Sequence, residues 1–224
     1  MDVSADAIVD AALRLGEVRS WETVRLHDVA AELGTDLEAI RCHFREKEDL
    51  VEAWFDRADQ AMLQVAATPA VAAMPAAERL ETLVWAWLQA LAPHRRLTRQ
   101  MIAGKLEAGH LHVQIPAVLR ISRTVQWLRE AAGRDAAGIH RGLEETVLTS
   151  LFVSTFLLWL RDPSDGRRLA RGYLRRGLRT ARRLSRWVPG YASGVDRRLL
   201  PPPDRQESAH PVSSVEQRQA TPNH

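Results

Sequence analysis

The chain has 224 residues, of which 46% are hydrophobic and 26% are charged, a composition typical of a folded globular protein with one or two domains. Its single cysteine, Cys42, excludes an internal disulfide framework, and no group of cysteines and histidines has the spacing of a zinc site. The longest nearly uncharged apolar stretch, residues 147–160, is shorter than the ~20 residues of a membrane-spanning helix. Because the N-terminus also lacks a signal-peptide pattern, we expect a cytoplasmic protein.

The net charge of +3 conceals an uneven distribution along the chain. Residues 166–188 contain nine arginines and no acidic residue. Residues 1–58 carry fourteen acidic residues against seven lysines and arginines. The first quarter of the chain is therefore acidic, and the basic character is concentrated in one later segment.

Helical periodicity dominates the first 65 residues. Ser4 suits a helix N-cap, Gly34 suits a left-handed C-cap, and Thr35-Asp36 offers an N-cap oxygen to the segment that follows. We predict four helices here, over residues 5–15, 27–33, 37–43 and 46–65.

The second half is also predicted to be helical. Small residues with Pro69 and Pro75 fill residues 66–77, which we interpret as a linker. Further helices are predicted over residues 78–91, 95–107, 116–132, 140–160 and 166–187. The last segment, residues 189–224, is poor in apolar residues and is expected to be a disordered tail. The predicted organisation is a three-helix domain at 1–50, a connecting helix at 51–65, the linker at 66–77, a helical domain at 78–188 and the tail.

The second and third predicted helices, joined by a turn that contains Gly34, have the layout of a helix-turn-helix. Apolar residues fix the two helices at a steep angle and leave the third helix free to enter a DNA major groove, which is about 12 Å wide. The sequence resembles the TetR family of one-component transcriptional regulators over roughly residues 5–64. The matching segments are residues 8–13, 21–22, 28–30, 33–34 and, above all, His-Phe-Arg-Glu-Lys-Glu-Asp-Leu at 43–50.

The resemblance implies an all-α, TetR-like fold that binds a double-stranded DNA operator and uses no cofactor. It places Arg41 and Lys47 at the DNA backbone, and Leu37, Glu38, Ala39 and either Cys42 or His43 at base edges. The predicted DNA-binding residues are Arg25, Thr35, Asp36, Leu37, Glu38, Ala39, Arg41, Cys42, His43 and Lys47.

Several positions depart from the family's usual residues. The family favours an aromatic residue at Gly16, glycine at Ser20, Ser or Thr at Arg25, Ser at Asp36, a small residue at Glu38 and Tyr at Arg41. Asp36 and Glu38 bring carboxylates toward phosphates, which disfavours binding, whereas Arg25 and Arg41 replace hydroxyl contacts with charged ones. The acidic character of residues 1–58 leaves open an alternative in which the three helices serve only as a packing module.

The resemblance assigns the helices after residue 78 to effector binding and dimerisation. Large apolar residues recur there at helical spacing, so most of them are expected to form the core. A cavity for a small apolar effector would be lined by Trp85, Leu88, Met101 and Val125. Candidate polar anchors are Glu81, His94, Arg99 and Gln126.

A homodimer is the expected assembly. Residues 148–160 are apolar nearly all round, which predicts burial on two sides. In the family, the last two helices of each subunit pack into a four-helix bundle, which would set two recognition helices about 34 Å apart. The predicted dimerisation residues are Leu151, Phe152, Thr155, Phe156, Trp159 and Tyr173.

The predicted helix over residues 166–187 is amphipathic, with a wide arginine face opposite Leu169, Tyr173 and Leu184. One interpretation is a solvated outer face of a dimerisation helix. Another is contact with anionic lipid or an acidic surface through residues 166–188. The second would suit the coenzyme Q accessory proteins, lipid-handling relatives of the same fold without DNA binding, which residues 91–127 and 162–164 resemble loosely.

We expect no enzymatic activity, because the sequence contains no hydrolase, metalloprotease, phosphate-loop or dinucleotide motif. Glu107 and His110, followed by His112, have the Glu-x-x-His spacing of di-metal bundles. Such a site needs that motif twice and two further carboxylates, so we expect no metal site.

Overall fold

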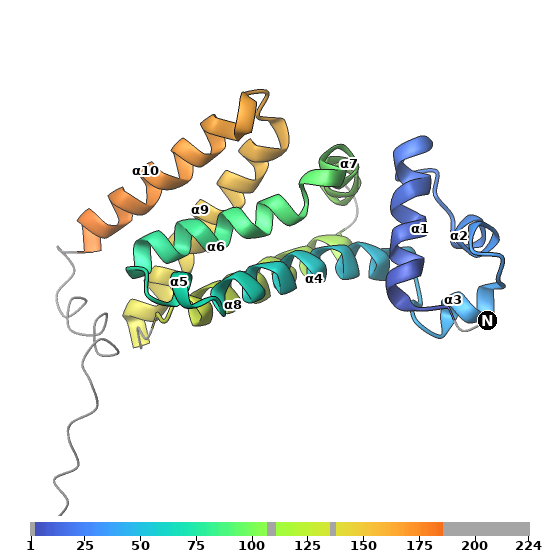
Figure 1. Cartoon of the computed structure of the whole chain (residues 1–224), viewed down its shortest axis with the longest axis horizontal. Helices are drawn as coiled ribbons and strands as arrows, with labels where there is room; N and C mark the ends of the chain where they lie inside the picture. The colour runs from blue at the N-terminus through green and yellow to red at the C-terminus, as the bar shows by residue number, and fades with distance from the viewer. Residues whose placement is uncertain (1–2, 107–110, 135–137, 186–224) are drawn as a thin grey trace, which may run out of the picture.

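The protein is described by a computed structural model that covers residues 3–106, 111–134 and 138–185. All regular structure within these ranges is helical. A unit of three short helices lies at one end, and longer helices form a bundle beside it (Figure 1). The all-α fold class expected from the sequence is confirmed.

The N-terminal unit consists of α1 (Ala5–Val18), α2 (Leu26–Glu32) and α3 (Leu37–Arg41). Each start or turn has a local cause. The Ser4 hydroxyl accepts a hydrogen bond from the Ala7 N–H at 3.2 Å, and Gly34 takes the left-handed conformation with φ of 63°. The Asp36 carboxylate accepts from the Ala39 N–H at 2.9 Å and so caps α3. These are the capping roles that the sequence predicted.

Helix α4 (Lys47–Ala66) runs from this unit into the bundle, where it packs along α6 (Ala76–Ala90) (Figure 1). Its buried face includes Leu50, Trp54, Ala58 and Met62, at the four-residue spacing of one helix face. Leu50 also belongs to the continuous core that contains the N-terminal unit, so α4 links the two parts both covalently and by packing.

The segment 66–77, predicted as a linker, contains the short helix α5 (Pro69–Ala72). Its proline occupies the first turn, where a missing N–H costs nothing. Arg79 then donates to the carbonyls of Val71 at 3.1 Å and Met74 at 3.0 Å, and also to that of Ala72. A cation therefore satisfies the carbonyl groups that a helix end leaves open.

The remaining helices complete the bundle around α4 and α6. They are the 3₁₀ turn η1 (Ala92–His94), α7 (Arg95–Leu106), α8 (Leu111–Ala131), α9 (Gly138–Arg161), the turn η2 (Asp165–Arg167) and α10 (Arg168–Ser185). The sequence predicts the start of this helix at Pro116, and α8 begins five residues earlier, at Leu111. The predicted tail, residues 189–224, lies outside the described residues.

Helix α9 is the one described segment, His140–Arg161, that is long and apolar enough to cross a membrane by length and composition. Its largest apolar side chains, however, belong to the protein core. Trp159 is fully buried and Phe152 is 3% exposed, and the Phe152 ring lies 4.9 Å from that of Trp87 on α6. Burial against neighbouring helices explains why this helix is apolar on most sides.

Candidate functional site

The surface formed by α2, α3 and the start of α4 gathers the residues that the sequence analysis assigned to DNA. Val29, Ile40 and Phe44 are buried and hold α2 against α3. The outer positions of α3 remain exposed, with Leu37 at 53%. The exposed predicted residues are Arg25, Asp36, Leu37, Glu38, Arg41, Cys42 and His43, while Thr35, Ala39 and Lys47 are half-buried.

Glu38 and Arg41 form a two-pronged ion pair on the exposed face of α3. Arg41 donates from Nε to Oε2 at 2.7 Å and from NH2 to Oε1 at 2.6 Å. The hydrogen bond from Arg41, followed by its charge, lowers the pKa of the Glu38 carboxyl. The carboxylate is therefore ionised at neutral pH, and the guanidinium lies along the helix.

Lys47 and Arg25 approach one backbone carbonyl at the edge of the same surface. The Lys47 ammonium donates to the carbonyls of Trp21 at 2.5 Å and Glu22 at 3.2 Å. Arg25 NH1 donates to the same Glu22 carbonyl at 2.8 Å. Partial burial, and next the charge of Arg25, lower the pKa of Lys47. Two cations that repel each other across one oxygen provide a favourable position for an anion such as a phosphate.

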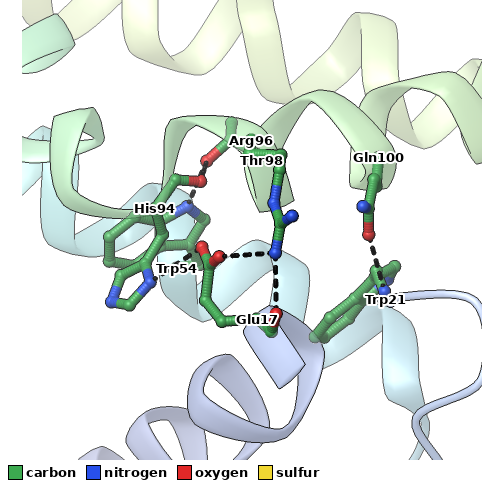
Figure 2. Close-up of polar contacts among 7 residues, drawn as sticks. All are labelled: Glu17, Trp21, Trp54, His94, Arg96, Thr98 and Gln100. Atoms are coloured by element: carbon green, nitrogen blue, oxygen red, sulfur yellow. Dashed lines mark hydrogen bonds and ion pairs between the residues drawn. The ribbon is translucent and has the colours of Figure 1, made fainter. Parts of the chain in front are cut away.

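A junction joins the N-terminal unit to α7 (Figure 2). On one side Glu17 accepts from Arg96 at 3.3 Å and lies 3.3 Å from His94 Nδ1. On the other side the Gln100 Oε1 atom accepts from the Trp21 N–H at 2.8 Å. Neither Trp21 nor Gln100 is predicted as a site residue from the sequence, because the bond joins residues 79 positions apart and no local pattern indicates it.

Two further contacts tighten this junction. The Trp54 indole on α4 donates to Thr98 at 3.0 Å within the core. The α carbon of Gly16 faces Leu97 so closely that an added Cβ would lie 2.7 Å from Leu97 Cδ1. The glycine that departs from the family pattern at Gly16 thus permits α1 and α7 to approach directly.

A small cavity of about 70 Å³ lies among α4, α6, α7, α8 and α9. Its walls are mostly aromatic and aliphatic, with a polar edge. The lining residues are Glu52, Phe55, Trp87, Ile102, Arg120, Ile121, Thr124, Phe152, Val153 and Phe156. A cavity of this kind can receive a small apolar molecule.

The four residues predicted to contact an effector do not line this cavity. Leu88, Met101 and Val125 are buried in the core, and Trp85 lies beneath the Arg171 guanidinium at 5.2 Å. Successive helix positions point about 100° apart, so Trp87, Ile102 and Thr124 face the cavity while their near neighbours do not. The predicted anchors Glu81, His94, Arg99 and Gln126 are also absent from its lining.

A buried polar network borders the cavity. Asp59 of α4 accepts from Trp87 Nε1 at 2.8 Å, Thr124 at 3.0 Å and Arg120 at 2.9 Å. Burial raises the pKa of the Asp59 carboxyl, and the Arg120 charge opposes that shift. Arg120 also pairs with Asp56. Asp59 and Phe55 both belong to α4, whose first residue is Lys47. The same helix therefore connects the cavity with the start of α4 at the helix-turn-helix surface.

An open groove of about 600 Å³ lies beside the cavity, between α8 and α9, and Ile121 and Val153 line both. Hydroxyl side chains of α9 line one wall. Thr146 donates to the Gly142 carbonyl at 2.9 Å, and Ser150 donates to the Thr146 carbonyl at 2.8 Å. The hydroxyl protons at these two positions are therefore used within the helix itself.

Most of the predicted dimerisation residues are not on the surface. Leu151, Phe152, Thr155, Phe156 and Trp159 are at most 9% exposed in the protomer. They fill the protomer's own core, so a direct dimer contact does not fit them. Tyr173 is 39% exposed, and its place in a dimer contact stays a prediction. On the last two helices, further large apolar residues that were not predicted as dimer contacts are exposed: Leu143 and Val147 on α9, and Leu169 and Leu184 on α10.

The arginine face of α10 is exposed at most positions. Arg175 donates to Glu81 of α6 at 2.8 Å, and Arg171 lies 3.6 Å from the same carboxylate. These contacts help to fasten α10 to α6. Among the described residues no group of three or more potential metal ligands is found. Glu107 and His110 lie outside the described residues, and nothing is described of the His112 side chain.

The chain is similar to several solved structures of transcriptional regulators. No protein-family model matches the chain, and no curated protein matches it. A TetR transcriptional regulator from Nitrosomonas europaea ATCC 19718 is 49% identical, with a TM-score of 0.71, over 82% of this chain and 98% of that one. A TetR regulator from Rhodococcus sp. RHA1 shares the fold at 19% identity and a TM-score of 0.60, over 78% of this chain and 93% of that one. A TetR-family regulator from Streptomyces coelicolor has 18% identity and the same TM-score, over 87% of each chain.

The first of these relatives is similar in sequence over nearly its whole length, and the fold agrees in all three. The resemblance found at the helix-turn-helix therefore extends through the helical domain. This chain belongs to the TetR family of DNA-binding transcriptional regulators.

Proposed function

We propose that the protein is a cytoplasmic, homodimeric repressor that releases its DNA operator when a small apolar effector enters the cavity among α4, α6, α7, α8 and α9. The observation that carries this proposal is the position of α4. Phe55 and Glu52 of this helix line the cavity, and its first residue, Lys47, lies on the helix-turn-helix surface. A change in α4 at one end is thus transmitted along one rigid helix to the other.

The effector acts by binding two conformations of the dimer unequally. A molecule larger than the about 70 Å³ of free space among Phe55, Trp87 and Phe156 has to displace these rings or favour a wider arrangement of them. Because Phe55 packs against both other rings, with centroids 5.8 and 6.1 Å away, the displacement reaches α4. The affinity for DNA falls when the separation of the two recognition helices no longer matches the half-site spacing.

We propose that Arg25, Arg41 and Lys47 contact phosphates, and that Leu37, Glu38, Ala39 and either Cys42 or His43 face the bases. Arg25 and Lys47 meet at the Glu22 carbonyl, at 2.8 and 3.2 Å, which supports the first assignment. The exposure of Leu37 and Glu38 supports the second. The anionic-lipid role of residues 166–188 stays a prediction.

The test is titration of the purified protein onto DNA from upstream of its own coding sequence, at two salt concentrations. Lys47→Ala is the test variant. Arg161→Ala, an exposed cation at the end of α9, is the matched control. We expect selective binding that weakens with salt, and a smaller salt dependence in Lys47→Ala alone. Equal loss in both variants, or binding without sequence preference, would contradict the proposal.

A further inference from the structure

Trp21, between α1 and α2, uses its backbone and its ring to connect α7 with Lys47. Its N–H donates to Gln100 Oε1 of α7 at 2.8 Å, and its carbonyl accepts from the Lys47 ammonium at 2.5 Å. The same ammonium lies 4.9 Å from the centroid of the indole ring, at the distance of a cation–π contact. One residue therefore separates the C-terminal domain from a cation on the helix-turn-helix surface.

The connection is held on both sides. Trp21 is only 8% exposed, so its ring has little room to take another orientation. Beside it, Leu97 is fully buried against Gly16, and α1 and α7 approach with no space for a further carbon atom. A shift of α7 is consequently transmitted to the segment that contains Trp21, rather than absorbed in a loose interface.

The state of Lys47 depends on that segment. An ammonium has three N–H donors, of which the carbonyls of Trp21 and Glu22 take two. The third remains for a phosphate. A lysine fixed by two carbonyls and one ring loses less side-chain freedom on meeting DNA than a free lysine does. If the Trp21 carbonyl moves, the ammonium loses its shorter bond and its place beside Arg25.

We propose that Gln100 and Trp21 are positioning residues for Lys47, so that α7 controls how the Lys47 ammonium is presented to the DNA backbone. This inference rests on the DNA contact of Lys47 in the proposed function. It adds a second route from the C-terminal domain to DNA, separate from the movement of α4. The route runs from Gln100 through the Trp21 backbone to the Lys47 Nζ atom.

The experiment compares four variants by DNA affinity as a function of salt. Gln100→Met removes the acceptor for Trp21, whereas Gln100→Glu keeps a side-chain acceptor of nearly the same shape. Lys47→Ala removes the cation itself. Arg96→Ala is the matched control, because it breaks contacts of the same junction with Glu17 and touches neither Trp21 nor Lys47.

The salt dependence separates a positioning role from a merely structural one. We expect Gln100→Met to reduce the slope of log affinity against log salt by about 0.9 per protomer, as Lys47→Ala does, because one phosphate contact is lost. The affinity ratio between wild type and variant should then change roughly threefold per protomer from 50 to 200 mM salt. Gln100→Glu should recover the wild-type slope, and the double variant Gln100→Met/Lys47→Ala should be no worse than Lys47→Ala.

Each other outcome has one meaning. A wild-type slope in Gln100→Met, with a reduced slope in Lys47→Ala, overturns the positioning role and leaves the DNA contact standing. An unchanged slope in Lys47→Ala overturns the contact, and the positioning role with it. An equal reduction in Arg96→Ala means that the junction acts as a whole and not through Trp21. Thermal unfolding of every variant confirms that the protein compared is folded.

Discussion

Arg41 engages both carboxylate oxygens of Glu38 across one turn of α3, at 2.7 and 2.6 Å. The pair stands on the helix that the family inserts into the major groove. The pair weakens the attraction of Arg41 for phosphates, since the arginine charge is compensated before DNA arrives. A helix with this pair has less attraction for any DNA sequence than one with a free arginine.

Glu38→Gln should therefore tighten DNA binding. The change releases Arg41 and removes a negative charge from the interface, so we expect the salt slope to steepen by up to about 0.9 per protomer. Fluorescence anisotropy on the upstream DNA measures this. Glu32→Gln, a neutralisation on α2 of a residue paired with Arg14, is the control. If both variants gain equally, net charge alone explains the effect.

Occupation of the cavity should stabilise the protein. Toluene, a neutral single-ring probe, should raise the free energy of unfolding by about 1.4 kcal/mol at tenfold excess over its Kd, which is about 3–6 °C in Tm. Val153→Phe adds a ring to the cavity wall and should abolish the shift. Leu184→Phe adds the same ring at an exposed position and should keep it. A shift that persists in Val153→Phe would place the probe elsewhere.

The pH dependence of stability should carry the signature of Asp59. Burial raises its folded-state pKa above the unfolded value, so the folded protein binds the proton more tightly. Its contribution is then fully present below the unfolded pKa of about 3.9 and is lost as pH rises through the folded pKa. Urea unfolding across pH should show a decline in wild type, relative to Asp59→Asn, over that window.

The contribution of Glu81 to stability should depend on pH in the opposite direction to that of Asp59. The hydrogen bond from Arg175 lowers the pKa of its carboxyl, so its contribution is present above the ordinary glutamate pKa and is lost as pH falls through the folded value. Glu81→Gln should therefore lose stability at neutral pH and little in acid. If the two variants changed with pH in the same direction, the assigned causes would be wrong.

The effect of Gly16→Ala on the free energy of unfolding should change sign when Leu97 is shortened. Gly16→Ala brings a Cβ to 2.7 Å from a fully buried leucine and should destabilise the protein, by about 1–3 kcal/mol for overpacking. In a Leu97→Ala background the space is free, and the same change should stabilise by about 0.5–1 kcal/mol through helix propensity. Chemical denaturation of the four proteins in this cycle gives the coupling. Equal effects in both backgrounds would mean that Leu97 is not the obstacle.

Dimerisation should depend on the exposed apolar residues of α9 and α10. Leu143→Glu or Tyr173→Glu should raise the dimer dissociation constant at least tenfold, because a charge would enter an apolar contact. Sedimentation velocity measures it. Val18→Glu, at a position that is 83% exposed on α1, should leave the dimer intact. Dimers that survive both substitutions would place the interface on another face.

The sequence predicted those parts of the fold that local physics determines. Ser4, Gly34 and Asp36 act within a few residues of their partners, so the caps that they form could be predicted. The rotation of a helix about its own axis relative to its neighbours could not be predicted. For that reason Trp85 was expected at the cavity wall, where the structure has Trp87. In α9, apolar residues surround the helix, so periodicity alone does not separate its protomer core from its outer face.

Contacts between distant segments escaped prediction altogether. The bond from Trp21 to Gln100 spans 79 residues, and that from Lys47 to Trp21 spans 26. The residue types at these positions do not indicate which distant residue they contact. The resemblance pointed to Lys47 as a DNA contact but carried no information on what holds its side chain, which only the packed structure defines.

The hydroxyl groups of α9 affect what the groove between α8 and α9 can accept. The Thr146 and Ser150 hydroxyls donate their hydrogen bonds to the carbonyls one turn earlier. Toward a bound molecule these two oxygens can therefore act only as hydrogen-bond acceptors. At these two positions the groove therefore favours molecules that bring their own N–H or O–H groups, and it resists those that present only carbonyl or ether oxygens.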